Sequence, residues 1–283
     1  MGRALRSLEE PYRSRAVPPG TTRYWSWLFA AREARKPLLG IYALMAEWRA
    51  LMDPGTEAGV AQIKLAWWRE EMERMAAGSP LHPISRYLAD FPCAAATDFA
   101  PLTRSVEAAA EHVTGAPLER AVELESHADA LYGAPLLVAA LLGGVRGDRN
   151  GVHACVAALA AAEYVARAIA DYGREARAGR ILFAVDELLA AGIENDDFVA
   201  GEPPPRLRTY LNQLRQRAAG YYSTAAAALA PGERPQLRHL LVLAALGAKH
   251  LDRRKPRSDA DFGLADLYNA WNTARRAAAA APR

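Results

Sequence analysis

The sequence predicts an all-α protein. Apolar residues recur at three- and four-residue spacing along nearly every segment, alanine is abundant, and runs of β-branched residues are scarce. Hydrophobic residues make up 51% of the 283-residue chain, which is enough for a sizeable core. We therefore expect one domain over residues 1–283, built from roughly ten helices, with residues 1–20 as a loosely ordered N-terminal arm.

Five segments carry the clearest helical pattern, and local breakers separate them. In residues 64–78, Leu65, Trp68 and Met72 fall on one stripe, and Gly78 is suited to end the helix. The triple proline at 203–205 predicts a loop that enters a helix directly, because proline is well tolerated in a first helical turn. The predicted helices span residues 64–78, 118–133, 152–179, 207–230 and 235–254.

Composition argues against several classes of protein. The formal net charge of +3 is too small to indicate a nucleic-acid partner. Cys93 and Cys155 lack the spacing of a zinc site or a disulfide framework, which favours a reducing, cytoplasmic setting. The most apolar segment, 131–145, is interrupted by glycine and proline, so we expect no membrane-spanning helix. We interpret the basic run 249–257 as a solvated helix end, with contact to a diphosphate or peripheral contact to the inner face of a membrane as the alternatives.

The best candidate for chemistry is an acidic pair in the longest predicted helix. Asp171 and Glu175 are four residues apart, which places both carboxylates on one helix face. Two oxygen ligands one turn apart suit an Mg²⁺ ion that completes its shell with water and substrate phosphate. Arg174 and Arg180 could then bind phosphate oxygens. On spacing alone, a solvated salt-bridge ladder with Arg167 explains the same residues and is the more common case.

Three stretches of the chain resemble a known family. RYWSWLFAAREARKPLLGIYAL (23–44) is similar to its opening aromatic stretch and first long helix, and KLAWWREEMERMAAGSPLHPISRYL (64–88) to its next helix and His-Pro loop. In REARAGRILFAVDELLAAGI (174–193), a helix end at Gly179, a basic residue, an extended stretch and a helix start at Asp186 follow one another as in the family. These features resemble the squalene/phytoene synthases, the head-to-head prenyl transferases, over most of the chain.

The resemblance implies an isoprenoid-synthase-type helical bundle with a central cavity. In active members, two acidic motifs on facing helices hold Mg²⁺ around the diphosphate of a prenyl substrate. The metal neutralises the leaving group as a Lewis acid, and the apolar interior houses the prenyl chain and protects a carbocation from water. The matching residues are Asp171, Glu175 and Asp53 as catalytic groups, the first two also as Mg²⁺ ligands, and Tyr24, Tyr42, Arg49, Arg174 and Arg180 as substrate-binding groups.

The sequence departs from the family pattern at the first acidic motif. That motif falls on Arg49, Ala50 and Asp53, so its leading acids are absent. Arg49 lies one turn before Asp53, and we expect its guanidinium group to pair with that carboxylate where a metal would otherwise bind. The second motif retains Asp171, while its later acid is Glu175, which is one methylene longer.

A subgroup of the family shows the same loss; it includes a mitochondrial assembly factor for respiratory complex I and its bacterial relatives. AEWRALMDPGTE (46–57) and FGLADLYNAWNTARRA (262–277) resemble this subgroup. Three functions follow as alternatives: a protein that binds an isoprenoid diphosphate or similar lipid with transferase activity weak or lost, an active divergent prenyl transferase, or a non-enzymatic assembly factor with a protein partner. We favour the first and third, and expect Mg²⁺ as a cofactor only in the second.

Overall fold

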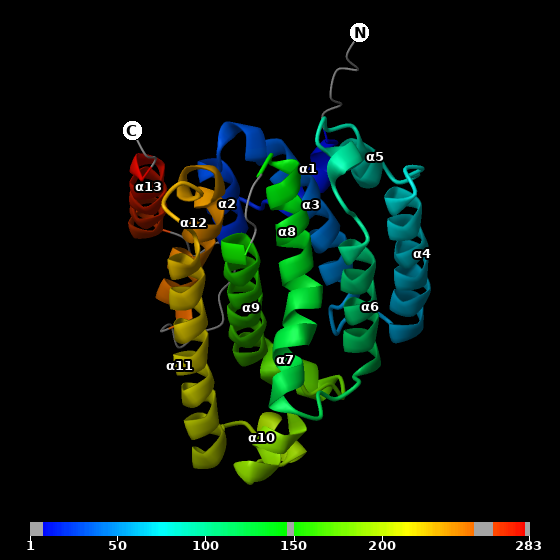
Figure 1. The fold of residues 1–283 in the computed structure, drawn as a ribbon. Coiled ribbons are helices and arrows are strands. Elements are labelled where there is room, and N and C mark those ends of the chain that lie inside the picture. The colour runs from blue at the N-terminus through cyan, green and yellow to red at the C-terminus, as the bar shows by residue number, and fades with distance from the viewer. Residues whose placement is uncertain (1–7, 146–149, 252–262, 281–283) are drawn as a thin grey trace.

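The computed structural model describes residues 8–145, 150–251 and 263–280. It is all-α, as predicted: these residues form thirteen α-helices, and the isolated bridge between Leu118 and Ala184 is the only β-type pairing among them. The helices lie side by side as a bundle (Figure 1). Their bounds are α1 (Glu10–Ala16), α2 (Thr22–Phe29), α3 (Arg32–Leu51), α4 (Ala58–Ala76), α5 (Pro83–Ala89), α6 (Pro101–Thr114), α7 (Ala121–Ala128), α8 (Ala134–Leu142), α9 (Asn150–Arg177), α10 (Val185–Ala190), α11 (Pro205–Ala228), α12 (Arg234–Leu251) and α13 (Leu264–Ala279).

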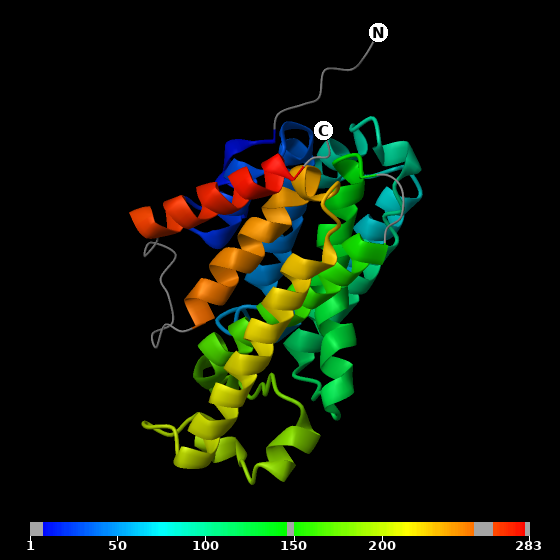
Figure 2. The ribbon, with the colours of Figure 1, turned by 60° about the vertical axis from the view of Figure 1, so that its left-hand side comes forward.

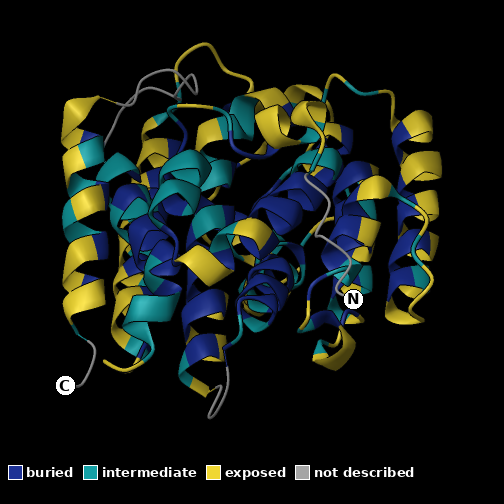
Figure 3. Ribbon diagram, turned by 90° about the horizontal axis from the view of Figure 1, so that it is seen from above, coloured by how far each residue is buried: buried dark blue, intermediate teal, exposed yellow. Residues whose placement is uncertain are grey.

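The central helix of the bundle is α9. It packs most extensively against α11 and also contacts α7, α8 and α12, while α4 and α13 lie at opposite outer edges (Figures 1 and 3). By length and by a mean hydropathy of 1.4 over 18 residues, α9 could cross a membrane. Because 61% of that window is buried inside the bundle, α9 has the properties of a core helix. Glu163 interrupts its apolar run, which is why the sequence did not predict a candidate span here.

The predicted helix boundaries are confirmed at four places. Gly78 follows α4 and Gly179 follows α9, and both have a positive φ (75° and 76°) that favours glycine at a helix end. After Gly179 the chain is non-helical through Ala184, and α10 starts at Val185. The helix predicted after the triple proline starts at Pro205.

Two predictions near the ends of the chain have different outcomes. The prediction of a loosely ordered arm over residues 1–20 was wrong for the part that the structure describes, from residue 8 onward. There α1 packs on α3, and Ala16 and Val17 are buried. The apolar side of this short helix thus finds a partner that the sequence alone did not reveal. Most of the basic run 249–257 lies outside the described residues.

The contact between α11 and α12 depends on Gly247. A Cβ atom at this position would lie 2.3 Å from Cζ of Tyr222. Tyr222 is fully buried and its hydroxyl donates a hydrogen bond to Glu163, so the ring is held in place. We expect Gly247→Ala to destabilise the protein by about 1–3 kcal/mol, measured as the free energy of unfolding in urea.

Gly220 provides the matched control for this substitution. It also lies within a helix, α11, but a Cβ atom there would meet nothing within 4 Å. Gly220→Ala should therefore be neutral or stabilise the protein by about 0.4–1 kcal/mol. Equal effects of the two substitutions would show that the α11–α12 contact adapts to the extra methyl group.

Candidate functional site

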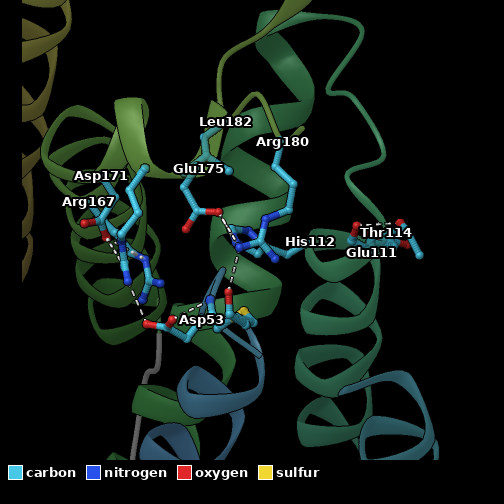
Figure 4. A network of polar contacts seen from close by, with 12 residues as sticks. Asp53, Glu111, His112, Thr114, Arg167, Asp171, Glu175, Arg180 and Leu182 are labelled. Carbon is cyan, nitrogen blue, oxygen red and sulfur yellow. Dashed lines mark hydrogen bonds and ion pairs between the residues drawn. The ribbon is translucent and has the colours of Figure 1, made fainter. Parts of the chain in front are cut away.

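The candidate site lies where the end of α3 faces the last turns of α9 (Figure 4). Asp53 follows the end of α3, and its Oδ1 accepts the N–H of Gly55 at 2.8 Å. Its Oδ2 accepts a hydrogen bond from Arg174 Nη1 of α9 at 2.7 Å. The N–H of Gly55 lowers the pKa of Asp53 below its usual range, and Arg174 adds to this against the opposing effect of burial. Both side chains are 46% exposed, so the ion pair joins α3 and α9 at the surface.

Three charged residues of α9 continue this contact as a ladder. Asp171 Oδ2 lies 3.6 Å from Arg167 Nε and 3.5 Å from Arg174 Nη2. The carboxylate is therefore held between two guanidinium groups on one face of the helix (Figure 4). The structure thus forms the salt-bridge ladder that the sequence offered as an alternative, and Arg174 extends it across to Asp53.

Glu175 is separate from this ladder and its side chain is completely buried. Its Oε2 lies 2.7 Å from Arg180 Nη2 and 3.7 Å from His112 Nε2 of α6. The same Arg180 nitrogen donates to the carbonyl of Met52 at 3.1 Å, which ties the segment after α9 to the end of α3. Burial raises the pKa of Glu175, but His112 and Arg180 lower it by more, so the net shift is downward.

A further polar cluster lies deeper in the bundle. Tyr222 of α11 donates a hydrogen bond to Glu163 Oε1 of α9 at 2.9 Å. Burial raises the pKa of Glu163, and Tyr222, Arg23 and Arg49 offset part of that rise. Glu163 still keeps some accessible surface, whereas Tyr222 is fully buried.

The two tyrosines predicted to bind substrate have structural partners. Tyr42 of α3 is buried, and its hydroxyl lies 2.9 Å from Oγ of Ser26 on α2. Tyr24 of α2 is half-buried and packs edge-on against Trp25, with 5.1 Å between ring centroids. In the described contacts, both side chains belong to the packing around α2, and neither takes part in the ladder of α9.

The predicted ion pair between Arg49 and Asp53 was wrong. Arg49 does not pair with Asp53, because α3 ends at Leu51 and the turn beyond it directs this carboxylate to Arg174 of α9. Arg49 instead contributes positive charge near Glu163. Arg180 is 7% exposed and donates to the carbonyl of Met52, and it also lines a pocket, so its role in binding phosphate stays a prediction.

The residues present do not fit the Mg²⁺ site that the sequence suggested. Asp171 faces two guanidinium groups, Asp53 is bonded to Arg174, and Glu175 is buried against Arg180. Asp53 and Asp171 therefore share the counter-charge of Arg174, and Glu175 is neutralised by Arg180. Among the described residues, no group of three or more His, Cys, Asp and Glu side chains could hold a metal ion.

A pocket of about 490 Å³ opens on the other side of Arg180. It lies between α6, α7 and the segment after α9, and His112, His127 and Tyr164 are among its lining residues. Burial, and then the nearby His112, lower the pKa of His127 to about 4, so its ring is neutral near pH 7. None of the described lining residues belongs to α3, but Arg180 and His112 line the pocket, so it adjoins the Glu175 cluster of the candidate site.

Comparison with known proteins decides the family. The sequence model of the squalene/phytoene synthases matches residues 17–275. The chain belongs to the squalene/phytoene synthase family. Phytoene synthase 1 (chloroplastic) of Arabidopsis thaliana is 23% identical over 208 residues, which cover 72% of this chain and 49% of the relative. Phytoene synthase 2 (chloroplastic) of Solanum lycopersicum is 22% identical over 208 residues, which cover 72% of this chain and 67% of the relative. The chain thus spans about half the length of most curated relatives it matches.

Two solved structures of family enzymes share the fold. A dehydrosqualene synthase in complex with a ligand superposes with a TM-score of 0.71 and 14% identity, covering 90% of both chains. The squalene synthase HpnC from Alicyclobacillus acidocaldarius gives a TM-score of 0.66 and 19% identity, covering 86% of this chain and 94% of that one. These likenesses confirm the predicted all-α isoprenoid-synthase-type fold.

Sequence reasoning missed two residues of this squalene/phytoene synthase family site. Glu163 continues the spacing of Arg167 and Asp171 by one more turn, so the four-residue period could have revealed it. His112 carried no such signal, because it lies on α6 and meets Glu175 only in the folded chain.

Proposed function

We propose that this member of the squalene/phytoene synthase family binds an isoprenoid diphosphate or a similar lipid, and that Mg²⁺-dependent prenyl transfer is weak or lost. The observation that carries the proposal is the 2.7 Å ion pair between Arg174 and Asp53. It places a guanidinium group between the two helices whose family motifs hold metal in active members. The family relationship supports the choice of ligand class.

Ionisation of an allylic diphosphate requires strong neutralisation of the leaving group, which metal ions provide as Lewis acids. A guanidinium group supplies a single positive charge and hydrogen bonds in a fixed fork. Arg174 can therefore bind a phosphate, but with Asp53 and Asp171 as its neighbours it gives little net charge to a leaving group. This charge balance favours binding over ionisation.

Binding should be independent of Mg²⁺. We expect a non-ionisable farnesyl diphosphate analogue to raise the unfolding temperature equally in EDTA and in Mg²⁺. A ligand that binds only the native state at a hundredfold excess over its dissociation constant stabilises it by about 2.7 kcal/mol. Arg174→Gln should weaken this stabilisation, since it removes the exposed cation at the α3–α9 contact.

Arg208→Gln is the matched control for this measurement. Arg208 is also an exposed arginine in a surface ion pair, with Glu202, but its described polar contacts are with Glu202 and the carbonyl of Pro203 and none is with α3 or α9. The control should bind the analogue as the wild type does. Stabilisation that appears only with Mg²⁺ would indicate a functional metal site instead, and no stabilisation in either condition would remove the ligand from the proposal.

A further inference from the structure

The exposed side of α13 carries an unusual row of apolar side chains. Leu264, Tyr268 and Trp271 are 85%, 62% and 46% exposed, and Arg275 continues the row one turn later. Their spacing of four, three and four residues places them on one helix face. We call these four residues the α13 face. The helix lies along the outer edge of the bundle (Figure 2).

Only one side of α13 is used for packing within the described residues. Ala270, Ala274 and Ala277 are buried, mainly against α12, with a smaller contact to α2. Asp266 is also buried, and its Oδ1 lies 2.9 Å from Nζ of Lys249 on α12. These contacts hold the helix in a fixed orientation, so the α13 face points outward as a consequence of the fold.

A pocket of about 220 Å³ borders the α13 face. Trp271 and Arg275 line it from α13, together with Arg35 and Arg238. Arg238 donates from Nε to the carbonyl of Phe29 at 2.7 Å, and Arg35 donates to the carbonyl of Leu28 at 2.8 Å. Both guanidinium groups are thus fixed by carbonyls at the end of α2.

In the described part of the chain, the positive charge in this pocket is only partly balanced by a nearby acid, Glu33. Among the described residues, none of the three arginines forms an ion pair with a carboxylate; Arg275 instead lies over the Trp271 ring at 5.3 Å. Burial, and then the charge of Arg35, lower the pKa of Arg238, which Glu33 only partly opposes. Clustered guanidinium groups favour an anion, and their planar fork suits phosphate oxygens.

We propose that the α13 face docks on an anionic phospholipid membrane, with a lipid phosphate in the arginine pocket. Tyrosine and tryptophan favour the membrane–water interface, because one end of each ring is apolar and the other polar. A helix with an apolar row and adjacent arginines has the composition of an interfacial helix. A second copy of the chain is a poorer occupant, since a two-fold dimer through this face would bring the arginine clusters together. The proposal concerns a surface apart from the α3–α9 site.

The test is flotation of the purified protein with vesicles. We expect binding to phosphatidylcholine vesicles that contain phosphatidylglycerol, little binding to pure phosphatidylcholine, and release at high salt. Arg275→Gln should lower vesicle affinity about fivefold, and the double substitution of Tyr268 and Trp271 by serine at least roughly tenfold. Ile63→Ser is the matched control, because Ile63 is 74% exposed on α4 and lies at the opposite edge.

Several results would overturn the proposal. The wild type failing to bind anionic vesicles, or Ile63→Ser reducing binding as much as the α13 variants, would each reject it. Thermal stabilisation by glycerol phosphate without vesicle binding would assign the pocket to a free phosphate. A dimer detected by sedimentation, and lost in the Tyr268 and Trp271 variant, would assign the face to a second copy.

Discussion

Replacement of Glu175 by glutamine is expected to lower the free energy of unfolding by about 3–5 kcal/mol. The side chain is completely buried, and its carboxylate lies 2.7 Å from Arg180, which is itself 7% exposed. The substitution would leave the guanidinium group buried without its counter-charge. The loss of stability is measured by urea unfolding with linear extrapolation.

Asp171→Asn is the control that makes this result specific. Asp171 is the other half of the acidic pair, but it lies in the partly exposed ladder with Arg167 and Arg174. We expect a cost of about 1 kcal/mol or less. In a metal site without its metal, removal of either carboxylate would relieve repulsion and stabilise the protein. Stabilisation by Glu175→Gln would therefore contradict a structural role for this residue.

Acidification from pH 7 to 4 is expected to remove about 3 kcal/mol of stability through His239. This side chain on α12 is completely buried, and burial, followed by the charge of Arg238, lowers its pKa to about 4. Because the folded pKa lies below the ordinary histidine value of 6.5, protonation favours the unfolded chain. The contribution is complete above about pH 6.5 and is lost as the pH falls towards 4.

The pH dependence of unfolding in variants measures this effect. His239→Phe should reduce the loss of stability between pH 6.5 and 5 by roughly half, because His127, whose pKa burial also lowers to about 4, remains. His153→Phe should keep the wild-type slope, since His153 is exposed on α9. Carboxylates with lowered pKa values, such as Glu175 and Asp53, contribute at a different pH. Their stabilisation is present above the unfolded carboxyl pKa and is lost as the pH falls through the folded value. An unchanged slope in His239→Phe would exclude His239 as its source.

Local signals were sufficient to predict much of the fold. The glycines at 78 and 179 and the proline at 205 set helix boundaries through their own backbone preferences, so no knowledge of neighbours was needed. The position of α1 was not predictable, because its few apolar residues are buried only by contact with α3, which lies outside the local sequence pattern that defines the helix. Helix content is thus a local property here, and the docking of short helices is not.

The site was predictable only in its composition. The sequence indicated that arginine and aspartate would meet near the end of α3, but not which arginine. Arg49 is nearer to Asp53 along the chain than Arg174 is. The turn after Leu51 nevertheless directs the Asp53 carboxylate to Arg174. The spacing of Asp171 and Glu175 was also correct for a shared face, but the burial of Glu175 depends on His112 and Arg180 from other segments.

The guanidinium group of Arg174 lies at the contact between α3 and α9 in a protein that keeps the fold of its family. The fold is retained, as the superposition on a dehydrosqualene synthase indicates. In this structure the ion pair between Arg174 and Asp53 joins α9 to the end of α3, and the proposed loss of prenyl transfer rests on that pairing.

Release of inorganic diphosphate from farnesyl or geranylgeranyl diphosphate in the presence of Mg²⁺ tests this interpretation most directly. We predict that the purified protein releases no diphosphate above the background without protein, and that Asp171→Ala behaves identically. Mg²⁺-dependent release at a rate typical of enzymes, on the order of 1 s⁻¹ or more, that is abolished by Asp171→Ala would contradict the loss of the metal site.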